Sequence, residues 1–356
     1  PKHSILSNFN DLSDYLKHFG EISSELKPIL KRVVDNYKTV IVMTCNQGQS
    51  DLLMNFACSA RAKGLEDVLK HVLVFPTDVE TKELAEGLGL ATYYDERNFG
   101  KLPSAEARRY ADPTFTAMMF AKVVCVQLVN FLGYNVLFQD VDIVWYQNPL
   151  NYFNDEEKSG NFDVYFQDDG QHSVRYAPYS ANSGFYYVRH NARTRYLFTT
   201  VLYYGDMIKA WGSHQQALVA VLTDHASYYG LRVKVLGRDE NEFPGGFHYH
   251  RRRDFMKGLV QQKQKDAYIF HMSWTTNKGN KLKFFKQMGE WYLSDQCAKG
   301  KTLQDIVGGD AMVDTHPLVE PCCLSEPRIV CHFSDKPSTI PCKDSPKIDK
   351  GGRAFW

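Results

Sequence analysis

The sequence has no excess of charge of either sign and no long uninterrupted apolar run. Among 356 residues, 42 Lys and Arg oppose 41 Asp and Glu, for a formal net charge of +1. A protein that binds duplex nucleic acid needs a basic field to meet the phosphates, so we expect no nucleic-acid partner. The basic cluster at 250–253 is interpreted as a solvated loop.

Signals that would place the chain in or across a membrane are also missing. No run approaches the ~18–20 apolar residues that span a bilayer, and the N-terminus has no signal-peptide pattern. The chain begins at Pro1 without Met. We therefore expect any membrane contact to come only from an anchor outside this fragment, as in the lumenal part of a type II membrane protein.

Two further motifs are absent. The turn Asn46-Gln47-Gly48-Gln49 holds one glycine, which argues against a nucleotidyltransferase with a Gly-rich triphosphate loop. No Asn-x-Ser/Thr sequon occurs, so glycosylation signals lend no support to a secretory location.

The eight cysteines fall into two groups. Three lie in apolar stretches and are predicted to be buried thiols. The others include a cluster in a Pro-rich tail with little apolar periodicity, where we expect disulfides and hence an oxidising, secretory compartment such as the Golgi lumen. A zinc site is the alternative, but paired CxxC spacing is lacking. The predicted thiols are Cys45, Cys58 and Cys125, and the tail cluster is Cys322, Cys323, Cys331 and Cys342.

Strands alternate with helices over the first part of the chain, which predicts a mostly parallel α/β sheet. Ligands of such sheets bind beyond the carboxyl ends of the strands. We expect a helical segment over 1–37, one catalytic domain over 38–295 and a cysteine-bearing extension over 296–356. The predicted strands are 39–44, 71–75, 90–94, 135–140, 163–166, 184–188, 233–236 and 267–271, and the helices are 50–62, 79–87, 114–131, 191–208, 213–223 and 281–293.

Two aspartates end an apolar strand in Phe138-Gln139-Asp140-Val141-Asp142-Ile143-Val144-Trp145. Residues two apart on extended backbone point the same way, so Asp140 and Asp142 face one point while Val141 turns into the core. Such carboxylates repel unless a cation lies between them, and hard oxygen ligands suit Mn²⁺ or Mg²⁺. The same pair occurs in solvated turns, but the apolar flanks favour a metal site that neutralises a leaving diphosphate.

A second group of polar residues follows the last predicted strand. A neutral imidazole at His271 can complete a metal shell, and Lys278 can meet a phosphate as a point charge. Taken alone, His271 is more often a core histidine and Trp274 more often a packing residue. Their functional role requires both segments to end at the same edge of the sheet.

These segments occur in an order that resembles a known family. They are Thr44-Cys45-Asn46, Phe120-Ala121-Lys122, the run 133–145 with Asn148-Pro149-Leu150, Asn182-Ser183-Gly184-Phe185, His214-Gln215-Gln216, and His271 with Lys278. Together they resemble glycosyltransferase family 77, nucleotide-diphospho-sugar transferases of the GT-A fold that are close to the glycogenin-like family 8. The resemblance covers about 38–292, and it implies a Rossmann-like, mostly parallel central sheet flanked by helices, with the cysteine-containing tail outside it.

The resemblance also implies roles for individual residues. It makes Asp140, Asp142 and His271 the metal ligands. The implied contacts to the nucleotide and donor sugar are Thr44, Asn46, Lys122, Asp140, Val141, Asp142, Asn182 and Lys278. The implied catalytic residues around the transferred sugar are Gln215, Asp168 and Asp169, and Trp274 and His214 are placed toward the acceptor.

One position departs from the family pattern. The family has Asp where this chain has His214, and a histidine cannot accept sugar hydroxyl protons as an ionised carboxylate does. The resemblance further implies retention of anomeric configuration. Retention arises either from a carboxylate nucleophile, for which Asp168 and Asp169 are candidates, or from same-face attack, which the resemblance favours, with Gln215 assisting electrostatically.

We therefore expect a Mn²⁺-dependent hexosyl- or pentosyltransferase. The donor would be a UDP-sugar of the galactose, xylose or arabinose class, and the acceptor a glycan, polysaccharide or glycoprotein. The alternatives are an inactive sugar-nucleotide-binding scaffold and a metal-dependent nucleotide-sugar hydrolase, which would need an evident general base for water.

Overall fold

The protein is described by a computed structural model over residues 2–108, 111–170, 174–237, 242–260, 265–275, 277–308 and 316–329. Its centre is a seven-stranded sheet in the order β3-β2-β1-β4-β7-β6-β8. β1, β2, β3 and β4 run parallel, and β6 and β8 run parallel to each other. β7 lies antiparallel between β4 and β6, and a separate two-stranded sheet pairs β5 with β9.

The predicted fold class, an α/β protein of GT-A type with a mostly parallel sheet flanked by helices, is confirmed. The strands are β1 Thr39–Cys45, β2 Val72–Pro76, β3 Ala91–Thr92, β4 Asn135–Gln139, β5 Ile143–Trp145, β6 Val164–Asp168, β7 Ala181–Val188, β8 Val233–Leu236 and β9 Ile269–His271. The helices are α1 Lys2–Val33, α2 Ser50–Ala62, α3 Glu66–Leu69, α4 Val79–Gly87, α5 Glu96–Phe99, α6 Pro113–Phe131, α7 Leu150–Asn154, α8 Glu156–Ser159, α9 Ala192–Tyr203, α10 Gly205–Trp211, α11 His214–Tyr229, α12 Gly246–Arg251, α13 Arg253–Val260, α14 Lys278–Met288, α15 Leu303–Val307 and α16 Val319–Cys322.

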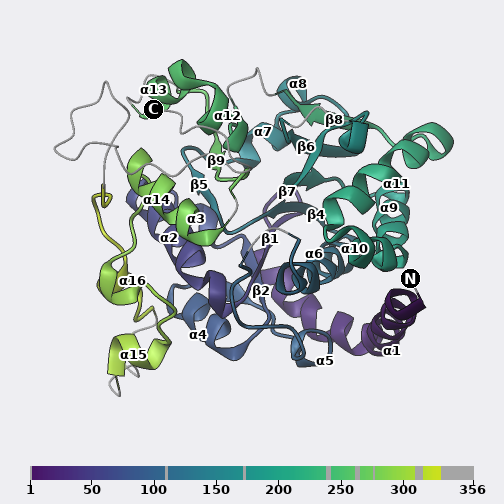
Figure 1. The fold of residues 1–356 in the computed structure, drawn as a ribbon, viewed down its shortest axis with the longest axis horizontal. Helices are drawn as coiled ribbons and strands as arrows, with labels where there is room; N and C mark the ends of the chain where they lie inside the picture. Colours follow the sequence, from purple (N-terminus) through teal and green to yellow (C-terminus); the bar gives the residue numbers. More distant parts are fainter. Residues whose placement is uncertain are drawn as a thin grey trace.

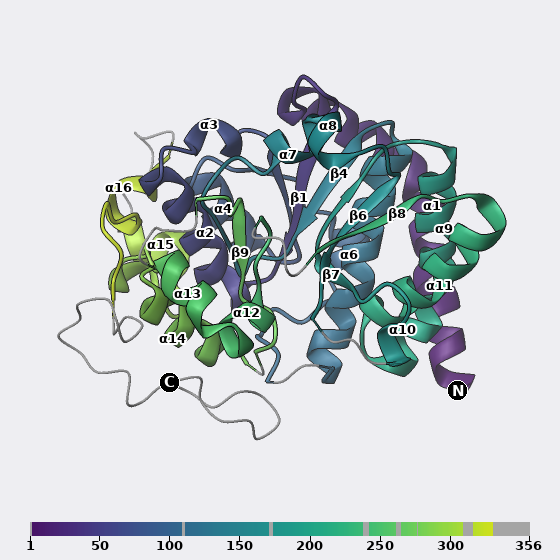
Figure 2. The same ribbon diagram turned by 90° about the horizontal axis from the view of Figure 1, so that it is seen from above.

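Two hydrophobic cores cover the two faces of the sheet (Figures 1 and 2). One core packs α1, α6, α9, α10 and α11 against the sheet. The other packs α2, α3, α4, α14 and the C-terminal segment with α15 and α16. Strand β1 is buried along its whole length, as expected for a strand covered on both faces.

Helix α6 begins and ends where capping rules place its bounds. The Asp112 carboxylate accepts a hydrogen bond from the Phe115 amide, and Pro113 occupies the first turn. Among the described residues, α6 is long and apolar enough to cross a membrane, but 61% of its most apolar window is buried inside the protein. The central helix of a folded domain has the same properties, and the buried helix predicted over 114–131 is confirmed.

The last predicted helix differs from the observed one. α14 begins at Lys278 instead of 281 because the Asn277 side chain accepts a hydrogen bond from the Asn280 amide. It ends at Gly289, whose φ of 75° suits the left-handed conformation that closes helices. The earlier start places Lys278 and Lys281 together on the first turn of α14.

Two disulfides hold the described C-terminal residues 295–308 and 316–328, which we call the strap. Cys58 on α2 bonds to Cys323, and Cys297 bonds to Cys322. The expectation that tail cysteines form disulfides is confirmed for Cys322 and Cys323, whereas Cys331 and Cys342 lie outside the described residues. The prediction of a free thiol at Cys58 was wrong, because an apolar helix position also suits a cysteine that bonds to a covering segment.

Removal of the long-range disulfide is predicted to destabilise the protein strongly. Cys58→Ser with Cys323→Ser opens a loop with a sequence separation of 265 residues. The lost constraint on the unfolded chain is worth on the order of 4 kcal/mol. Urea denaturation should show this loss in the free energy of unfolding. A reducing agent should lower the stability of the parent by more than that of the double variant, which of these two bonds keeps only Cys297–Cys322. Equal stability of parent and variant would contradict the prediction.

Candidate functional site

The position of β7 brings polar residues of three strands together. Because β4 and β6 run in one direction and β7 in the other, the first residues of β7 meet the last residues of its neighbours. Asp140 follows β4, and its amide donates to the Gly184 carbonyl oxygen at 2.7 Å. Asp168 ends β6 and pairs with Ala181. The sheet edge at which ligands are expected therefore collects the predicted site.

Asp142 and His271 are joined through the small second sheet, which the sequence did not predict. In β5 and β9, Ile143 pairs with His271, and the Met272 amide donates to the Asp142 carbonyl oxygen at 2.9 Å. Side-chain ligand atoms of Asp140, Asp142 and His271 lie within 4.8 Å of one another. Two carboxylates and an imidazole form a donor set that suits Mn²⁺ or Mg²⁺.

Two lysines face the carboxylates of this group. Lys122 on α6 pairs with Asp140 at 2.5 Å, and Lys281 on α14 pairs with Asp142 at 2.5 Å. Burial alone would raise the pKa of Asp142, but the charges of Lys281 and His271 outweigh it and hold that pKa well below its usual range. The Asp142 carboxylate is thus available as an ionised ligand. Lys281 is a site residue that sequence reasoning missed, and its spacing from Lys278 on one helical turn was the available signal.

Gly184 makes room for this group of ligands. A Cβ atom there would lie 2.6 Å from His271 Cε1 and 2.8 Å from Asp140 Oδ2. The pairing of β6 with β7 also shifts register between Phe166 and Gln167, so this part of β7 follows β4 and approaches the carboxylates. Irregularities of this kind re-aim side chains next to functional sites. The absent side chain at 184 therefore fits a ligand cluster at this point.

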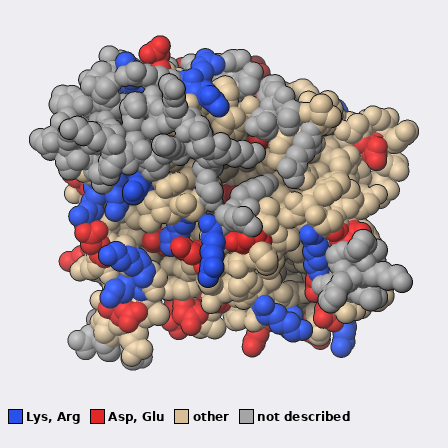
Figure 3. Space-filling model, in the orientation of Figure 1, with Lys and Arg blue, Asp and Glu red and all other residues tan. Residues whose placement is uncertain are grey.

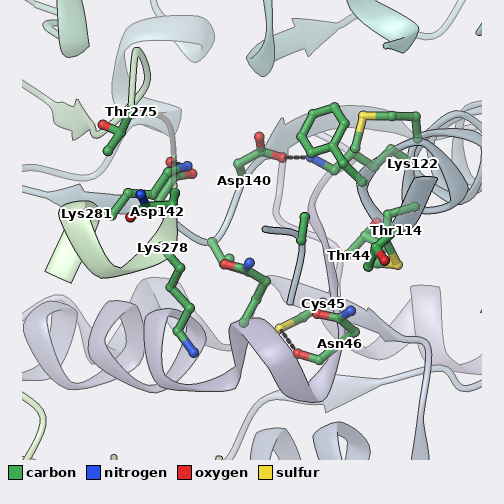
Figure 4. Close-up of a pocket in the computed structure, with 17 residues that line it drawn as sticks. Thr44, Cys45, Asn46, Thr114, Lys122, Asp140, Asp142, Thr275, Lys278 and Lys281 are labelled. Atoms are coloured by element: carbon green, nitrogen blue, oxygen red, sulfur yellow. Dashed lines mark hydrogen bonds and ion pairs between the residues drawn. The ribbon is translucent and has the colours of Figure 1, made fainter. Parts of the chain in front are cut away.

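A cleft with about 840 Å³ of space, part of it open to solvent, lies beside this cluster. Figure 4 shows Asp140 and Lys122 pointing toward each other, and Lys281 beside Asp142. The predicted donor-binding residues that line the cleft are Thr44, Asn46, Lys122, Asp140, Val141, Asp142 and Lys278.

Two of these predicted contacts have partners within the protein. Lys278 points away from Asp142 in Figure 4 and contacts Asp51 on α2 and the Gly48 carbonyl oxygen, each at 2.7 Å. The Asn46 amide nitrogen donates to two carbonyl oxygens of the loop that follows α5, at Pro103 and Ala105. Among the described residues, Asn46 Oδ1 has no hydrogen-bond partner although it is buried, which leaves an acceptor for a ligand.

The residues predicted around the transferred sugar form a network next to the cluster. The Asn182 side chain donates to Asp169 Oδ1 at 2.8 Å and accepts from the Gly184 amide at 2.7 Å. Burial raises the pKa of Asp169, and hydrogen bonds from Gln215 and Asn182 only partly offset this. Gln215 Oε1 accepts from the Ser183 amide at 3.1 Å. Asn182, Asp169 and Gln215 are thus brought together.

The other predicted residues lie at the margin of this network. Asp168 Oδ1 accepts from the Gly170 amide at 2.6 Å. Burial lowers the pKa of His214 to about 3, so the ring is neutral, and Nδ1 lies 3.0 Å from the Met119 sulfur. Trp274 has a φ of 59° and packs edge-on against Phe247. Residues held in this left-handed region are enriched at functional sites.

Comparison with known proteins identifies the family. The sequence profile of the nucleotide-diphospho-sugar transferases matches residues 67–285, which include the Asp140–Asp142 pair and His271. The chain belongs to this nucleotide-diphospho-sugar transferase family. The resemblance carried by the motifs is therefore confirmed.

Similar curated proteins are glycosyltransferases. One is "Beta-arabinofuranosyltransferase RAY1" of Arabidopsis thaliana, 24% identical over 75% of this chain and 50% of that protein. Another is "UDP-galactose:fucoside alpha-3-galactosyltransferase" of Dictyostelium discoideum, 24% identical over 72% of this chain and 43% of that protein. "UDP-D-xylose:L-fucose alpha-1,3-D-xylosyltransferase 3" of Arabidopsis thaliana is 27% identical over 47% of this chain and 45% of that protein. The chain spans about half the length of these relatives.

Solved structures that are similar to this chain are so at low identity. Mouse xyloside xylosyltransferase 1 is 13% identical, with a TM-score of 0.39, over 66% of this chain and 97% of that chain. The galactosyltransferase LgtC, solved with donor and acceptor sugar analogs, is 12% identical, with a TM-score of 0.42, over 65% of this chain and 86% of that chain.

Gly184→Ala is predicted to weaken metal binding without unfolding the protein. The added methyl group would meet His271 and Asp140 at distances that real contacts do not reach, so the ligands must separate. Mn²⁺ affinity, measured by electron paramagnetic resonance, should fall by about tenfold or more. Gly20→Ala is the matched control, because nothing lies within 4 Å of its Cβ position. Unchanged affinity in Gly184→Ala would show that the cluster does not hold the ion.

Proposed function

We propose that this protein is a retaining glycosyltransferase that moves a sugar of the galactose, xylose or arabinose class from a UDP-sugar to an acceptor hydroxyl. The observation that carries the proposal is the convergence of Asp140, Asp142 and His271 beside a cleft lined by Lys122, Lys278 and Lys281. A cation site next to several ammonium groups fits a nucleoside diphosphate, because the cation and the ammonium groups would together neutralise its negative charge. The relatives named above support this class of donor.

The three ligands would hold a divalent ion, for which Mn²⁺ is our proposal and Mg²⁺ the alternative. When bound, the ion supplies Lewis-acid stabilisation of the leaving diphosphate. Lys122 and Lys281 lie beside the carboxylates that would hold the ion, so we propose that both ammonium groups contact oxygens of the leaving diphosphate. Figure 3 shows charges of both signs interspersed on the face that it presents.

The surroundings of Asp169 bear on the mechanism of retention. A nucleophile must be an ionised carboxylate with a free oxygen. Asp169 Oδ1 is held by Asn182, and burial shifts its pKa upward, toward the protonated form. These facts support same-face attack, in which the leaving phosphate oxygen takes the acceptor proton. Gln215, Asn182 and Asp169 then form a positioning network around the sugar.

The acceptor and the compartment complete this proposal. We propose a glycan, polysaccharide or glycoprotein acceptor bordered by Trp274 and His214, since an aromatic face can stack on a sugar ring. The two disulfides support a secretory-pathway location such as the Golgi lumen. An anchor outside this chain remains part of this proposal.

The first test is UDP binding by calorimetry with and without Mn²⁺, in the parent and in Asp142→Asn. Binding should require Mn²⁺ in the parent and fall at least tenfold in the variant, because the amide cannot act as an anionic ligand. Asp67→Asn is the matched control, since that side chain is 95% exposed. UDP binding that ignores both metal and mutation would favour an inactive fold. A donor screen that shows hydrolysis without any gain from an acceptor would favour a hydrolase.

Lys281→Met is predicted to have opposite effects on the metal and on the nucleotide. Its ammonium group competes with an ion for Asp142 Oδ2, so Mn²⁺ affinity without nucleotide should rise several-fold. UDP affinity at saturating Mn²⁺ should instead fall about tenfold, because a charge-assisted contact worth ~1.5–3 kcal/mol is lost. Both can be measured by calorimetry, with the exposed Lys70→Met as control. If both affinities moved in the same direction, the idea that Lys281 leaves Asp142 to contact the diphosphate of UDP would be wrong.

A further inference from the structure

We propose that Gln167 is a positioning residue that sets the tautomer and ring orientation of His271, so that Nε2 presents its lone pair to the proposed metal site beside Asp140 and Asp142. This inference rests on the proposed metal site and adds a residue that the sequence motifs do not contain. Gln167 is the second-to-last residue of β6, directly after the apolar run Val164-Tyr165-Phe166, and is 1% exposed.

The orientation of the Gln167 amide is determined by its neighbours. Its nitrogen lies 2.9 Å from the Phe243 carbonyl oxygen and 3.0 Å from the Pro244 carbonyl oxygen. Two carbonyl oxygens can be satisfied only by the two N–H bonds of the amide nitrogen. The amide oxygen must therefore face the other way, and it lies 2.7 Å from His271 Nδ1.

This orientation leaves one protonation pattern for the neutral imidazole. A carbonyl-type oxygen can only accept, so Nδ1 must carry the proton. Nε2 is then the acceptor nitrogen, and it lies 3.6 Å from Asp142 Oδ1 and within the cluster of ligand atoms. Histidines that bind metals are oriented in this way, through a hydrogen bond from the second nitrogen.

The segment that holds Gln167 also holds the backbone of His271. The His271 amide donates to the Pro244 carbonyl oxygen at 3.1 Å, and Gly245 forms a bridge with His271. Pro244 therefore accepts one bond from the Gln167 side chain and one from His271. The segment around Pro244 therefore fixes the backbone of His271 directly and orients its ring through Gln167.

The register shift next to Gln167 gives this arrangement a structural cause. Phe166 pairs with Tyr186, but the following residue, Gln167, pairs with Asn182. Without the shift, regular pleating would continue along β7 past Phe185 and Gly184, the residue that makes room for the His271 ring. The irregularity thus places Gln167, Gly184 and His271 at one point, from three different strands.

The test combines a tautomer measurement with a metal affinity. Nitrogen-15 NMR of histidine-labelled protein without metal, assigned with His271→Ala, should show the Nδ1–H tautomer in the parent. In Gln167→Met, which loses the acceptor at similar volume, the Nε2–H tautomer should become populated. Mn²⁺ affinity by electron paramagnetic resonance should then fall by about 10–100-fold.

A second variant and a matched control separate positioning from general packing. Gln167→Glu keeps an acceptor for Nδ1–H and loses the two donors, so it should retain the Nδ1–H tautomer and more Mn²⁺ affinity than the Met variant. Gln147→Met is the control: Gln147 likewise donates to two carbonyl oxygens, those of Lys265 and Ala267. Its loss should leave the tautomer and the Mn²⁺ affinity unchanged.

The outcomes judge this inference apart from the proposed function. An Nε2–H tautomer in the parent, or a tautomer unchanged in folded Gln167→Met, would overturn the role of Gln167. Absence of Mn²⁺ binding in the parent, with the tautomer behaving as expected, would overturn the metal-dependent function and leave the orientation of His271 by Gln167 in place.

Discussion

The structure around the cleft depends on one electrostatic constraint, the placement of two carboxylates at the end of a buried strand. Two carboxylates placed this close repel one another unless cationic groups lie beside them. The fold supplies Lys122 on α6 and Lys281 on α14 as the cationic partners, and it places His271 on β9 beside the same two carboxylates. α6, α14 and β9 must therefore each place one of these side chains close to the end of β4. The same requirement explains why a cation and a diphosphate suit the cleft together. A bound cation would replace the lysines as the partner of the carboxylates, and the diphosphate would replace the carboxylates as the partner of the lysines.

Much of this arrangement could be predicted from the sequence, because it follows from local patterns. The apolar strand before Asp140 and the long apolar helix before it both have clear periodicity. The proximity of Asp140 and Asp142 is as predicted, but the reason differs, because residues 140–142 form a bend between β4 and β5 instead of extended strand. His271 could be placed at the same edge because its strand is short, apolar and followed by polar residues. The family motifs then connected these segments, and the profile match confirmed that connection.

What could not be predicted depends on contacts between distant segments. β5 and β9 are three residues each, too short for a periodic signal, and their pairing decides how Asp142 meets His271. Gln167 is a polar residue in an apolar strand, which indicates either a position at the edge of the sheet or a buried hydrogen bond. The sequence does not show which, because its partner His271 is 104 positions away. Cys58 looks like any buried helix residue until Cys323 is placed beside it. Lys281 was overlooked because the start of α14 was set three residues too late.

The strap contributes to the cleft through α2, the helix that begins beside it. Near the middle of α2, the Asn55 side chain donates to the Glu290 carbonyl oxygen and accepts from the Tyr292 amide, both in the segment that immediately precedes the strap. Just before α2, the Gln47 side chain donates to carbonyl oxygens of Gly300 and Lys301. Cys58 adds a covalent link one turn after Asn55. Because Asp51 on the first turn of α2 pairs with Lys278, any shift of this helix would move the lysine and, with it, the first turn of α14 that carries Lys281. The disulfide-bonded segment is therefore coupled mechanically to the charges that face Asp142, although it lies outside the motifs of the family.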